Sequence, residues 1–303
     1  MEKIKLLKKK KLGDTLKQIR LNQGLKQKDI YDEDGGFLPR STFQKIERNE
    51  SIPSYDRLQY IAKKMNTTIN EIEFLQYNKS LSEAEMLIYD FRRLRNSMYV
   101  DRVVDLKKRM ELFLEHNFDG RIIELIAILK AFILIEETQD FEAPREIVEF
   151  IWKRLEKQDE WQHFDMIILS NIFFIFPLDT ARAIIERLIN QLEAYKYFLN
   201  TQRLQLSILI NVTNFLKYHK KILESEEYII KSIELAIQIE NLTYESVARY
   251  RYAELLLVKG NKEQATKIAN DVFTILELGD KKEYLKELTN DWAKLNENIE
   301  DYT

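Results

Sequence analysis

The sequence contains no cysteine among its 303 residues, which excludes disulfide bridges, thiolate metal sites and cysteine nucleophiles. It has only 7 glycines and 4 prolines, so it is poor in the residues that form the frequent tight turns of sheet-rich proteins. Apolar residues nevertheless make up 45% of the chain, which is enough for a sizeable core. This balance predicts an all-α protein of about two domains.

The residue patterns of common enzyme sites are also missing. The three histidines, His116, His163 and His219, lie far apart and outside any HExxH motif. The chain has neither a glycine-rich phosphate loop nor a serine elbow, and paired acids such as Glu136-Glu137 lie among other charges at the end of a predicted helix. We therefore predict that the protein is not an enzyme and holds no metal or cofactor.

Apolar runs long enough to span a bilayer are absent too. The longest, "IIELIAILKAFILI" and "MIILSNIFFIFPL", are shorter than the ~20 residues that a membrane helix needs, and the first contains Glu124 and Lys130. The basic N-terminus "MEKIKLLKKKKLGD" lacks the apolar run of a signal peptide. We expect a cytoplasmic protein with no membrane partner.

Charge is distributed unevenly along the chain. Residues 1–66 contain 16 Lys or Arg against 9 Asp or Glu, a net charge of +7, whereas the remainder has 31 against 41, a net charge of −10. A solvated lysine-rich tail accounts for Lys8 to Lys11 but not for the other basic residues. The asymmetry indicates a polyanion partner for the N-terminal residues only.

The N-terminal region has the pattern of five short helices. Leu12, Leu16 and Ile19 are spaced as on one face of a helix that ends near Gly24, and "LKQKDIY" starts a second helix near residue 26. A third helix follows Pro39, a fourth follows Pro53, and "TTINEIEFL" predicts a fifth. Five short helices in fewer than 80 residues are typical of a small DNA-binding bundle.

The third predicted helix carries polar side chains at its beginning. Phe43 and Ile46 are spaced to face the bundle, which leaves Arg40, Ser41, Thr42, Gln44 and Lys45 to face outward. In helix-turn-helix proteins such hydroxyl, amide and basic groups reach the edges of DNA bases. Two alternatives remain, a bundle of this type that no longer binds DNA and one that binds protein.

The whole N-terminal module resembles the Xre and lambda-repressor-like helix-turn-helix family. The resemblance lies in Arg20, in Gln27, in the "IERN" helix end and in the "PSYDRLQYIA" fourth helix. The turn "DEDGGFLP" departs from the family because it is longer and more acidic. The resemblance implies that Arg40, Ser41 and Lys45 read base edges and that Arg20, Gln27 and Thr42 hold phosphates.

Beyond "NKSLSEAE" the chain repeats at an interval of roughly 40 residues. Helices are predicted to start at about 82, 121, 161, 200, 242 and 281, with two helices in each interval. The unit "YAELLLVKGNKEQATKIANDVF" resembles a tetratricopeptide repeat in the placement of its small and large residues. We predict a helix-turn-helix domain over residues 1–76 and a tetratricopeptide-like solenoid of helical hairpins over residues 77–303.

Polar residues recur in the middle of the apolar first helices of these hairpins. They are Lys130, Asn171, Asn211 and Arg251, at spacings of 41, 40 and 40 residues. On the fourth hairpin Arg203, Ser207, Asn211 and Asn214 share one helical stripe. Asn pairs with a peptide backbone and basic side chains pair with carboxylates, so we predict a ligand groove. The alternative is that these groups bond between helices and bind nothing.

The architecture as a whole resembles the Rgg/GadR/MutR family, within the peptide-responsive quorum-sensing regulators of Gram-positive bacteria. That resemblance implies a homodimeric transcription regulator whose repeats dimerise and, in many members, bind a short peptide on the concave face. A dimer also fits a pseudo-palindromic operator in double-stranded DNA. The predicted dimer surface is the stripe Leu285, Leu288, Trp292 and Leu295. The alternative is a DNA-binding scaffold or regulator without a small ligand, whose repeats recruit a protein partner.

Overall fold

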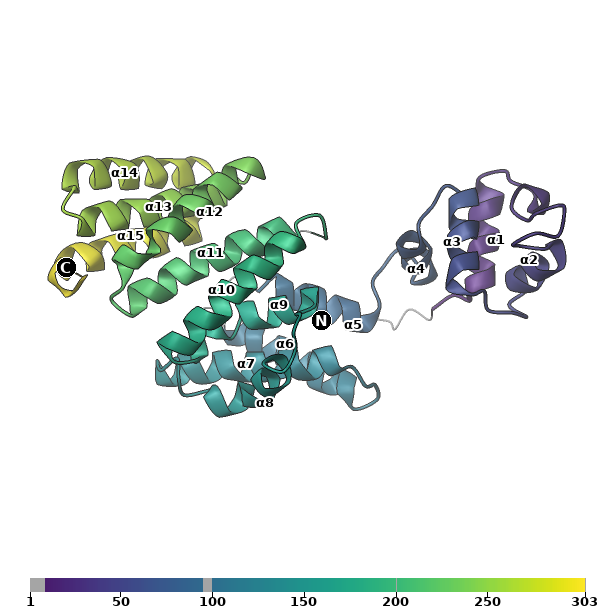
Figure 1. Ribbon diagram of the computed structural model, residues 1–303, viewed down its shortest axis with the longest axis horizontal. Helices are drawn as coiled ribbons and strands as arrows, with labels where there is room; N and C mark the ends of the chain where they lie inside the picture. The colour runs from purple at the N-terminus through teal and green to yellow at the C-terminus, as the bar shows by residue number, and fades with distance from the viewer. Residues whose placement is uncertain (1–8, 95–99, 200, 303) are drawn as a thin grey trace. The chain divides into compact units, whose positions relative to one another are not determined.

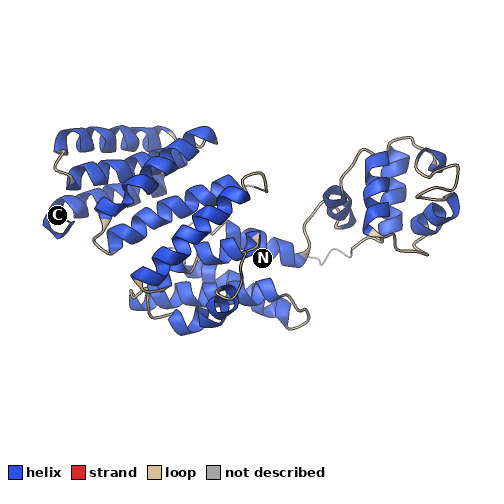
Figure 2. Cartoon of the chain, viewed as in Figure 1, coloured by secondary structure: helices blue, strands red, loops and turns tan. Residues whose placement is uncertain are grey.

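The structure is a computed structural model that describes residues 9–94, 100–199 and 201–302. Within these ranges every regular element is a helix, and the one isolated bridge joins Asp32 to Pro39 (Figure 2). The all-α prediction is therefore confirmed. The chain divides into two compact units, residues 1–123 and 124–303.

The first unit begins with the short helices predicted for a helix-turn-helix module (Figure 1). Its elements are α1 (Leu12–Asn22), η1 (Gln27–Asp29), α2 (Arg40–Glu47), α3 (Tyr55–Lys64), α4 (Ile69–Gln76), α5 (Glu83–Arg92) and α6 (Val100–Leu114). The second element is shorter than predicted, because η1 is a single 3-10 turn. The backbone after Ile30 instead enters the acidic turn that leads to Pro39.

Apolar side chains from α1 to α4 form one core. Leu16, Phe43, Ile61 and Met65 are completely buried, as the helical spacing of the sequence predicts. Ile30 and Leu38, on either side of the acidic turn, are buried in the same cluster. The core therefore holds both ends of the turn, and with them the start of α2.

The second unit consists of helical hairpins, as predicted, except that residues 281–302 hold a single α-helix, α15, followed by the 3-10 turn η4. The elements are α7 (Gly120–Thr138), α8 (Arg145–Leu155), α9 (His163–Ser170), η2 (Phe173–Ile175), α10 (Leu178–Ala194), α11 (Thr201–Tyr218), η3 (Ile222–Ser225), α12 (Glu226–Gln238), α13 (Leu242–Val258), α14 (Lys262–Leu278), α15 (Lys282–Glu297) and η4 (Ile299–Tyr302). Helix α7 begins before the unit boundary. The helices α5, α7, α9, α11, α13 and α15 start within two residues of the predicted positions.

The hairpin of α13 and α14 shows why the repeat forms. Ala253, Ala265 and Ala269 are completely buried, and these small side chains let α13 and α14 run side by side (Figure 1). Gly260 joins the two helices with a φ of +84°, a conformation that favours glycine. The tetratricopeptide-like pattern of this unit is therefore explained by close helix packing.

The C-terminal helix α15 corrects the predicted dimer surface. Leu288 and Leu295 are 1% and 2% exposed, and they pack in the core clusters formed with α13 and α14. The Trp292 ring lies 6.1 Å from the ring of Tyr250 on α13. Leu285 and Trp292 are half-buried against the same clusters, so the stripe packs mainly within the chain, where α15 completes the core of the last repeat.

Candidate functional site

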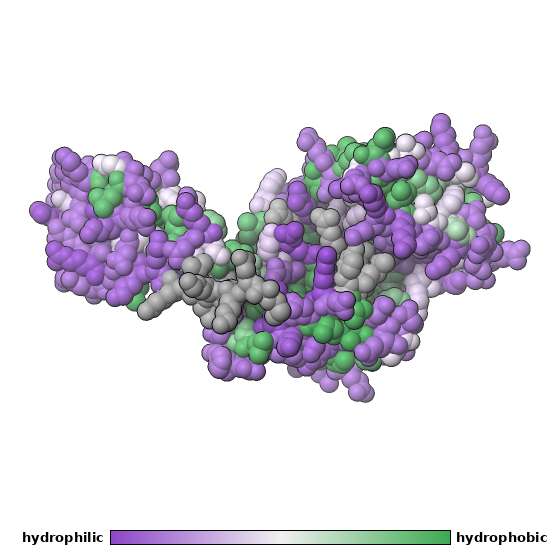
Figure 3. Space-filling model, turned by 180° about the vertical axis from the view of Figure 1, so that it is seen from behind, coloured by the Kyte–Doolittle hydropathy of each residue, from purple (hydrophilic) through white to green (hydrophobic). Residues whose placement is uncertain are grey.

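Helix α2 presents the side chains that were predicted to read DNA bases. Arg40, Ser41 and Lys45 are exposed, whereas Phe43 and Ile46 of the same helix are buried. Figure 3 shows mainly hydrophilic residues over the visible face of the N-terminal helices. The arrangement gives α2 a basic, hydrogen-bonding outer face on an apolar support, which is what a helix needs to enter the major groove.

The structure corrects the expectation that Arg20 holds a phosphate. Its side chain is buried, and Arg20 Nε donates to Glu47 Oε1 at 2.7 Å. Arg20 Nη1 also donates to the carbonyl oxygen of Leu25 at 2.8 Å. A buried charge is stable only with such partners, so the guanidinium is committed to joining α1 to the end of α2.

Gln27 is half-buried and joins the same network at its edge. Its amide nitrogen donates to Glu47 Oε2 at 2.6 Å, and its amide oxygen accepts from Gln44 at 3.2 Å. Thr42, also predicted to hold a phosphate, is half-buried on α2. Arg20, Gln27 and Glu47 therefore fix the orientation of α2 from within the bundle.

A second contact fixes the other end of the helix pair. Asn49 follows α2 with a φ of +61°, and its amide oxygen accepts from the backbone N–H of Gly13 at 2.7 Å. Asn49 also donates to Asp14 at 2.9 Å. A side chain at Gly13 would meet the carbonyl oxygen of Ile46 at 2.2 Å, so only glycine allows α1 to approach α2 this closely.

The acidic turn before α2 is organised around Asp32. The Asp32 carboxylate accepts from the Leu38 N–H at 2.9 Å and from the Tyr60 hydroxyl. The hydrogen bond from Tyr60 is the main cause of the lowered pKa of Asp32, and the same bond raises the pKa of Tyr60. The longer turn is therefore an ordered connection between η1 and α2.

The predicted ladder of four polar residues falls into three kinds of environment. Lys130 on α7 and Asn211 on α11 are exposed. Asn171, at the end of α9, is half-buried and donates to the Ile167 carbonyl at 2.7 Å. Arg251 on α13 is buried at 5% exposure, which corrects the expectation that it faces a groove.

The stripe on α11 keeps its predicted exposure. Arg203, Asn211 and Asn214 are exposed, and Ser207 is half-buried with its hydroxyl 3.2 Å from that of Tyr244. The rest of the helix is strongly apolar and largely buried. Amide and guanidinium groups are thus displayed in a row on a rigid helix, where they can bind backbone or carboxylate groups.

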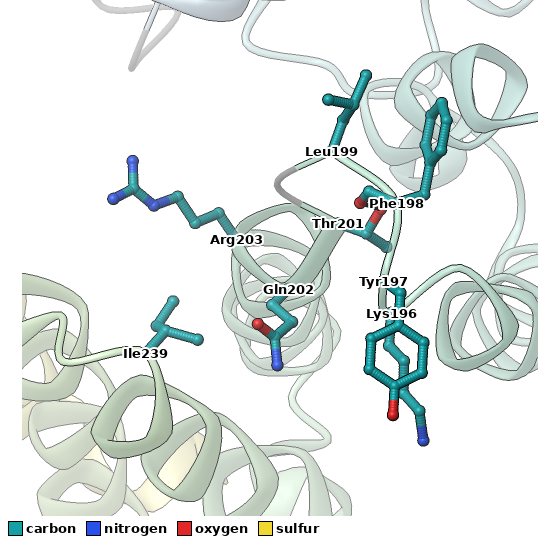
Figure 4. A pocket seen from close by; sticks show the side chains of 8 residues that line it. All are labelled: Lys196, Tyr197, Phe198, Leu199, Thr201, Gln202, Arg203 and Ile239. Carbon is teal, nitrogen blue, oxygen red and sulfur yellow. Dashed lines mark hydrogen bonds between the residues drawn. The ribbon is translucent and has the colours of Figure 1, made fainter. Parts of the chain in front are cut away.

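A shallow pocket lies at the beginning of this stripe (Figure 4). Arg203 and Ile239 lie on one side of it, and Lys196 and Tyr197 of the α10–α11 connection lie on the other. Tyr197 is 94% exposed. Apolar and basic groups therefore meet at the N-terminal end of α11.

Sequence reasoning missed the charged residues around Arg251. Together with Arg251 they form what we call the charge cluster, which consists of Lys217, Arg251, Glu254 and Asp291. Glu254, completely buried, lies 2.6 Å from Arg251 and 2.5 Å from Lys217. Burial lowers the pKa of Arg251, but its neighbours, with Glu254 the largest contributor, raise it, and the net shift of the pKa is upward. The signal in the sequence was Glu254 itself, a lone acid in the apolar run "YAELLLV", three residues after Arg251.

Comparison with known families identifies both parts of the chain. Residues 106–290 match the family described as HTH-type transcriptional regulator Rgg, C-terminal domain. The chain belongs to the Rgg family. Residues 16–72 of this Rgg protein match the helix-turn-helix family. It is thus a transcription regulator rather than an enzyme. No curated protein matches the chain.

Solved structures share the fold of this Rgg protein along most of its length. A putative transcriptional regulator from Listeria monocytogenes has a TM-score of 0.75 at 20% identity, and the match covers 96% of this chain and 98% of that one. The SHP pheromone receptor Rgg2 from Streptococcus dysgalactiae has a TM-score of 0.67 at 19% identity, covering 93% and 99%. PlcR from Bacillus thuringiensis, solved with the peptide PapR7 and DNA, has a TM-score of 0.62 at 22% identity, covering 91% and 99%.

Membrane-spanning helices and metal-binding clusters are both absent from the described part of this Rgg protein. Over residues 9–94, 100–199 and 201–302, no helix is long and apolar enough to cross a membrane. In the same ranges no three His, Asp or Glu side chains gather in a set that could hold a metal ion. The surfaces that remain as candidates are α2 and the α11 stripe.

Proposed function

We propose that this Rgg protein binds a pseudo-palindromic operator as a homodimer, and that a short peptide on the α11 stripe controls this binding. The observation that carries the peptide assignment is the row of exposed polar groups on the otherwise apolar α11. The names of similar structures support it, since Rgg2 is a pheromone receptor and PlcR was solved with a peptide and DNA.

The DNA contacts are assigned from exposure. Arg40, Ser41 and Lys45 read base edges from the outer face of α2, and Thr42 contacts a phosphate beside it. Arg20 and Gln27 act indirectly, because their bonds to Glu47 set the position of α2. We place the boundary between the DNA-binding and repeat domains after residue 76, at the end of α4.

The ligand contacts are assigned in the same way. Asn211 and Asn214 pair with the peptide backbone, while Arg203 and Lys130 attract its charged groups. Ser207 and Asn171 contribute smaller contacts because each is half-buried and already bonded within the chain. The protein works in the cytoplasm, where the chromosome is accessible to it.

Dimerisation follows from the small size of the DNA-reading module. One helix-turn-helix contacts only a few base pairs, so a single copy has too little specificity against a genome. Two copies on a pseudo-palindrome read twice as many. Light scattering at micromolar concentration should therefore give twice the mass of 36.4 kDa.

Selection of binding sites from random DNA tests the DNA assignment. Full-length wild type should enrich a pseudo-palindromic site whose half-sites are separated by a whole number of helical turns. The Lys45→Ala variant should enrich a relaxed half-site, whereas Lys63→Ala on α3 should enrich the wild-type site. If wild type enriched no sequence from the random DNA pool, sequence-specific binding would be ruled out.

Purification from the native cells tests the peptide assignment. We expect mass spectrometry of the denatured wild type to detect a short peptide that is absent from Asn211→Ala and Asn214→Ala double-variant samples. Arg249→Gln provides a matched control, because Arg249 is exposed on α13 and pairs with Glu245 outside the stripe. Equal amounts of peptide in all three proteins would show that the stripe does not bind it.

A protein partner is the alternative ligand of the repeats. The observation that favours it is the connection between α10 and α11, where Tyr197 is 94% and Leu199 is 65% exposed. Exposed aromatic and aliphatic side chains of this kind are typical of protein interfaces. If the purified protein carries a protein partner that Tyr197→Ser releases, and no peptide, this alternative is correct.

A further inference from the structure

The charge cluster joins the first helices of three repeats at the C-terminal end of α11. Lys217 comes from α11, Arg251 and Glu254 from α13, and Asp291 from α15. Glu254 bonds both cations at 2.5 and 2.6 Å. Asp291 reaches the same two cations at 3.5 Å from Lys217 and 3.3 Å from Arg251.

The two carboxylates of this cluster differ in accessibility. The Glu254 side chain is 1% exposed and its contacts are short, so it is a permanent part of the interior. The Asp291 side chain is 34% exposed, and its contacts are longer than the 2.7–2.9 Å that is usual between charged partners. Asp291 is therefore the weakly held member, at the edge of the cluster that solvent reaches.

The charge cluster contains more hydrogen-bond donors than the carboxylates of Glu254 and Asp291 satisfy. Arg251 Nε is buried without a hydrogen-bond partner. Arg251 is 5% exposed, so an unpaired donor there is costly. The cluster can thus accept a better-placed carboxylate than that of Asp291.

The exposed stripe on α11 leads directly to this position. Arg203, Ser207, Asn211 and Asn214 are followed, three residues further on, by Lys217 on the same side of the helix. The rise of α11 from Arg203 to Lys217 is about 21 Å, at ~1.5 Å per residue. This length corresponds to about six residues of an extended peptide.

We propose that the cluster is a carboxylate-binding site in which Asp291 occupies the place of a ligand carboxylate. The inference rests on the proposed peptide function. An apolar peptide of about six residues along the α11 stripe places its C-terminal carboxylate against Lys217 and the outer edge of Arg251. Asp291 is then released to solvent, and its contacts with Lys217 of α11 and Arg251 of α13 are lost.

Two matched pools of synthetic apolar hexapeptides test this site, one with a free C-terminal carboxylate and one amidated. Each pool is incubated with full-length protein, and retained peptide is measured by mass spectrometry after gel filtration. Wild type should retain the carboxylate pool roughly tenfold better, the effect of one charge-assisted hydrogen bond. Lys217→Met should abolish this preference.

The Asp291→Asn variant keeps the fold of the cluster and removes the internal competitor. It should retain the carboxylate pool about two- to fivefold better than wild type, as expected for one partly exposed ion pair. Asp301→Asn is the control, since Asp301 pairs at 3.0 Å with Lys220, which lies in the turn after α11 and outside the cluster. It should behave as wild type.

The outcomes separate this site from the proposed function. Retention of both pools to the same extent, or no gain in Asp291→Asn, would overturn the carboxylate site and leave peptide binding intact. Failure to retain either pool, with DNA binding preserved, would count against the peptide function and against the site together.

Discussion

The DNA-reading module and the repeats each contain a buried arginine paired with a buried glutamate. Arg20 bonds Glu47 between α1 and α2, and Arg251 bonds Glu254 within α13. Sequence reasoning assigned both arginines to ligands, a phosphate in one region and a peptide in the other. In both regions the main ligand-facing candidates are instead exposed residues on another helix, Lys45 on α2 and Asn211 on α11, and Arg251 meets the proposed peptide carboxylate only at its outer edge.

The difference between the two pairs lies in their surroundings. Glu47 serves Arg20 and Gln27 in a closed network within one small bundle. Glu254 serves Arg251 and Lys217, and this cluster extends to Asp291, whose side chain is 34% exposed. A closed network fixes a single geometry, whereas a network with an exposed member is open to exchange.

The largest expected effect is the loss of Glu254. Glu254→Gln leaves two cations without their main partner, so we expect the repeat unit to lose about 3–5 kcal/mol of unfolding free energy. Trp152, Trp161 and Trp292 are the only tryptophans in the sequence, so their fluorescence during urea unfolding reports on this unit alone. An unchanged urea midpoint would show that the cluster contributes little.

Arg20→Met should have a somewhat smaller effect, confined to the DNA-binding module. Removing one partner of a buried pair costs about 3 kcal/mol, and we expect far-UV circular dichroism to show early unfolding while tryptophan fluorescence is unchanged. The salt dependence of DNA binding should stay as in wild type. If the slope of the logarithm of the binding constant against the logarithm of the salt concentration fell by about one, Arg20 would contact a phosphate after all.

Arg40→Ala tests the exposed side of the same module. Loss of a base contact should weaken operator binding by about 1–3 kcal/mol and relax the preference at one base pair. Competition gel shifts with single-base operator variants measure both quantities. The Lys63→Ala variant on α3 is the control, and an equal loss in both variants would remove Arg40 from the base-reading set.

The smallest effect concerns the turn around Asp32. Its folded pKa is lowered chiefly by the Tyr60 hydroxyl, so Asp32 contributes stability above about pH 4 that is lost as the pH falls through the folded pKa. Tyr60→Phe should reduce this loss. The rate of hydrogen exchange at the Leu38 amide is measured in Tyr60→Phe and in wild type. The ratio of the two rates is then compared between pH 6 and pH 3. A ratio independent of pH would separate Asp32 from the turn.

Much of the fold could be predicted because it depends on local patterns. Leu16, Phe43 and Ile61 have helical spacing and are buried, and the 40-residue period places the starts of the repeat helices. The short η1 was missed because the acidic turn is held by Tyr60, which is distant in sequence. Contacts between separated residues decide such cases, and periodicity does not encode them.

The site residues were harder to assign for the same reason. A polar residue in an apolar helix either faces a groove or pairs with a buried partner. Its position in the sequence repeat is the same in both cases. Asn211 is exposed and Arg251 is buried, although both follow the same 40-residue repeat. What separates them is the partner of Arg251, the buried Glu254 one turn along α13, at 2.6 Å.

The central claim is that a peptide on the α11 stripe controls DNA binding. Fluorescence anisotropy of the selected operator, titrated with full-length protein with and without the co-purified peptide, tests it most directly. The peptide should shift the apparent Kd for DNA in wild type, because a ligand changes an equilibrium only by preferring one state. Asn211→Ala should need about two- to twelvefold more peptide for the same shift, from the loss of one hydrogen bond. A Kd that the peptide leaves unchanged in wild type, or an equal response in Asn211→Ala, would contradict the claim.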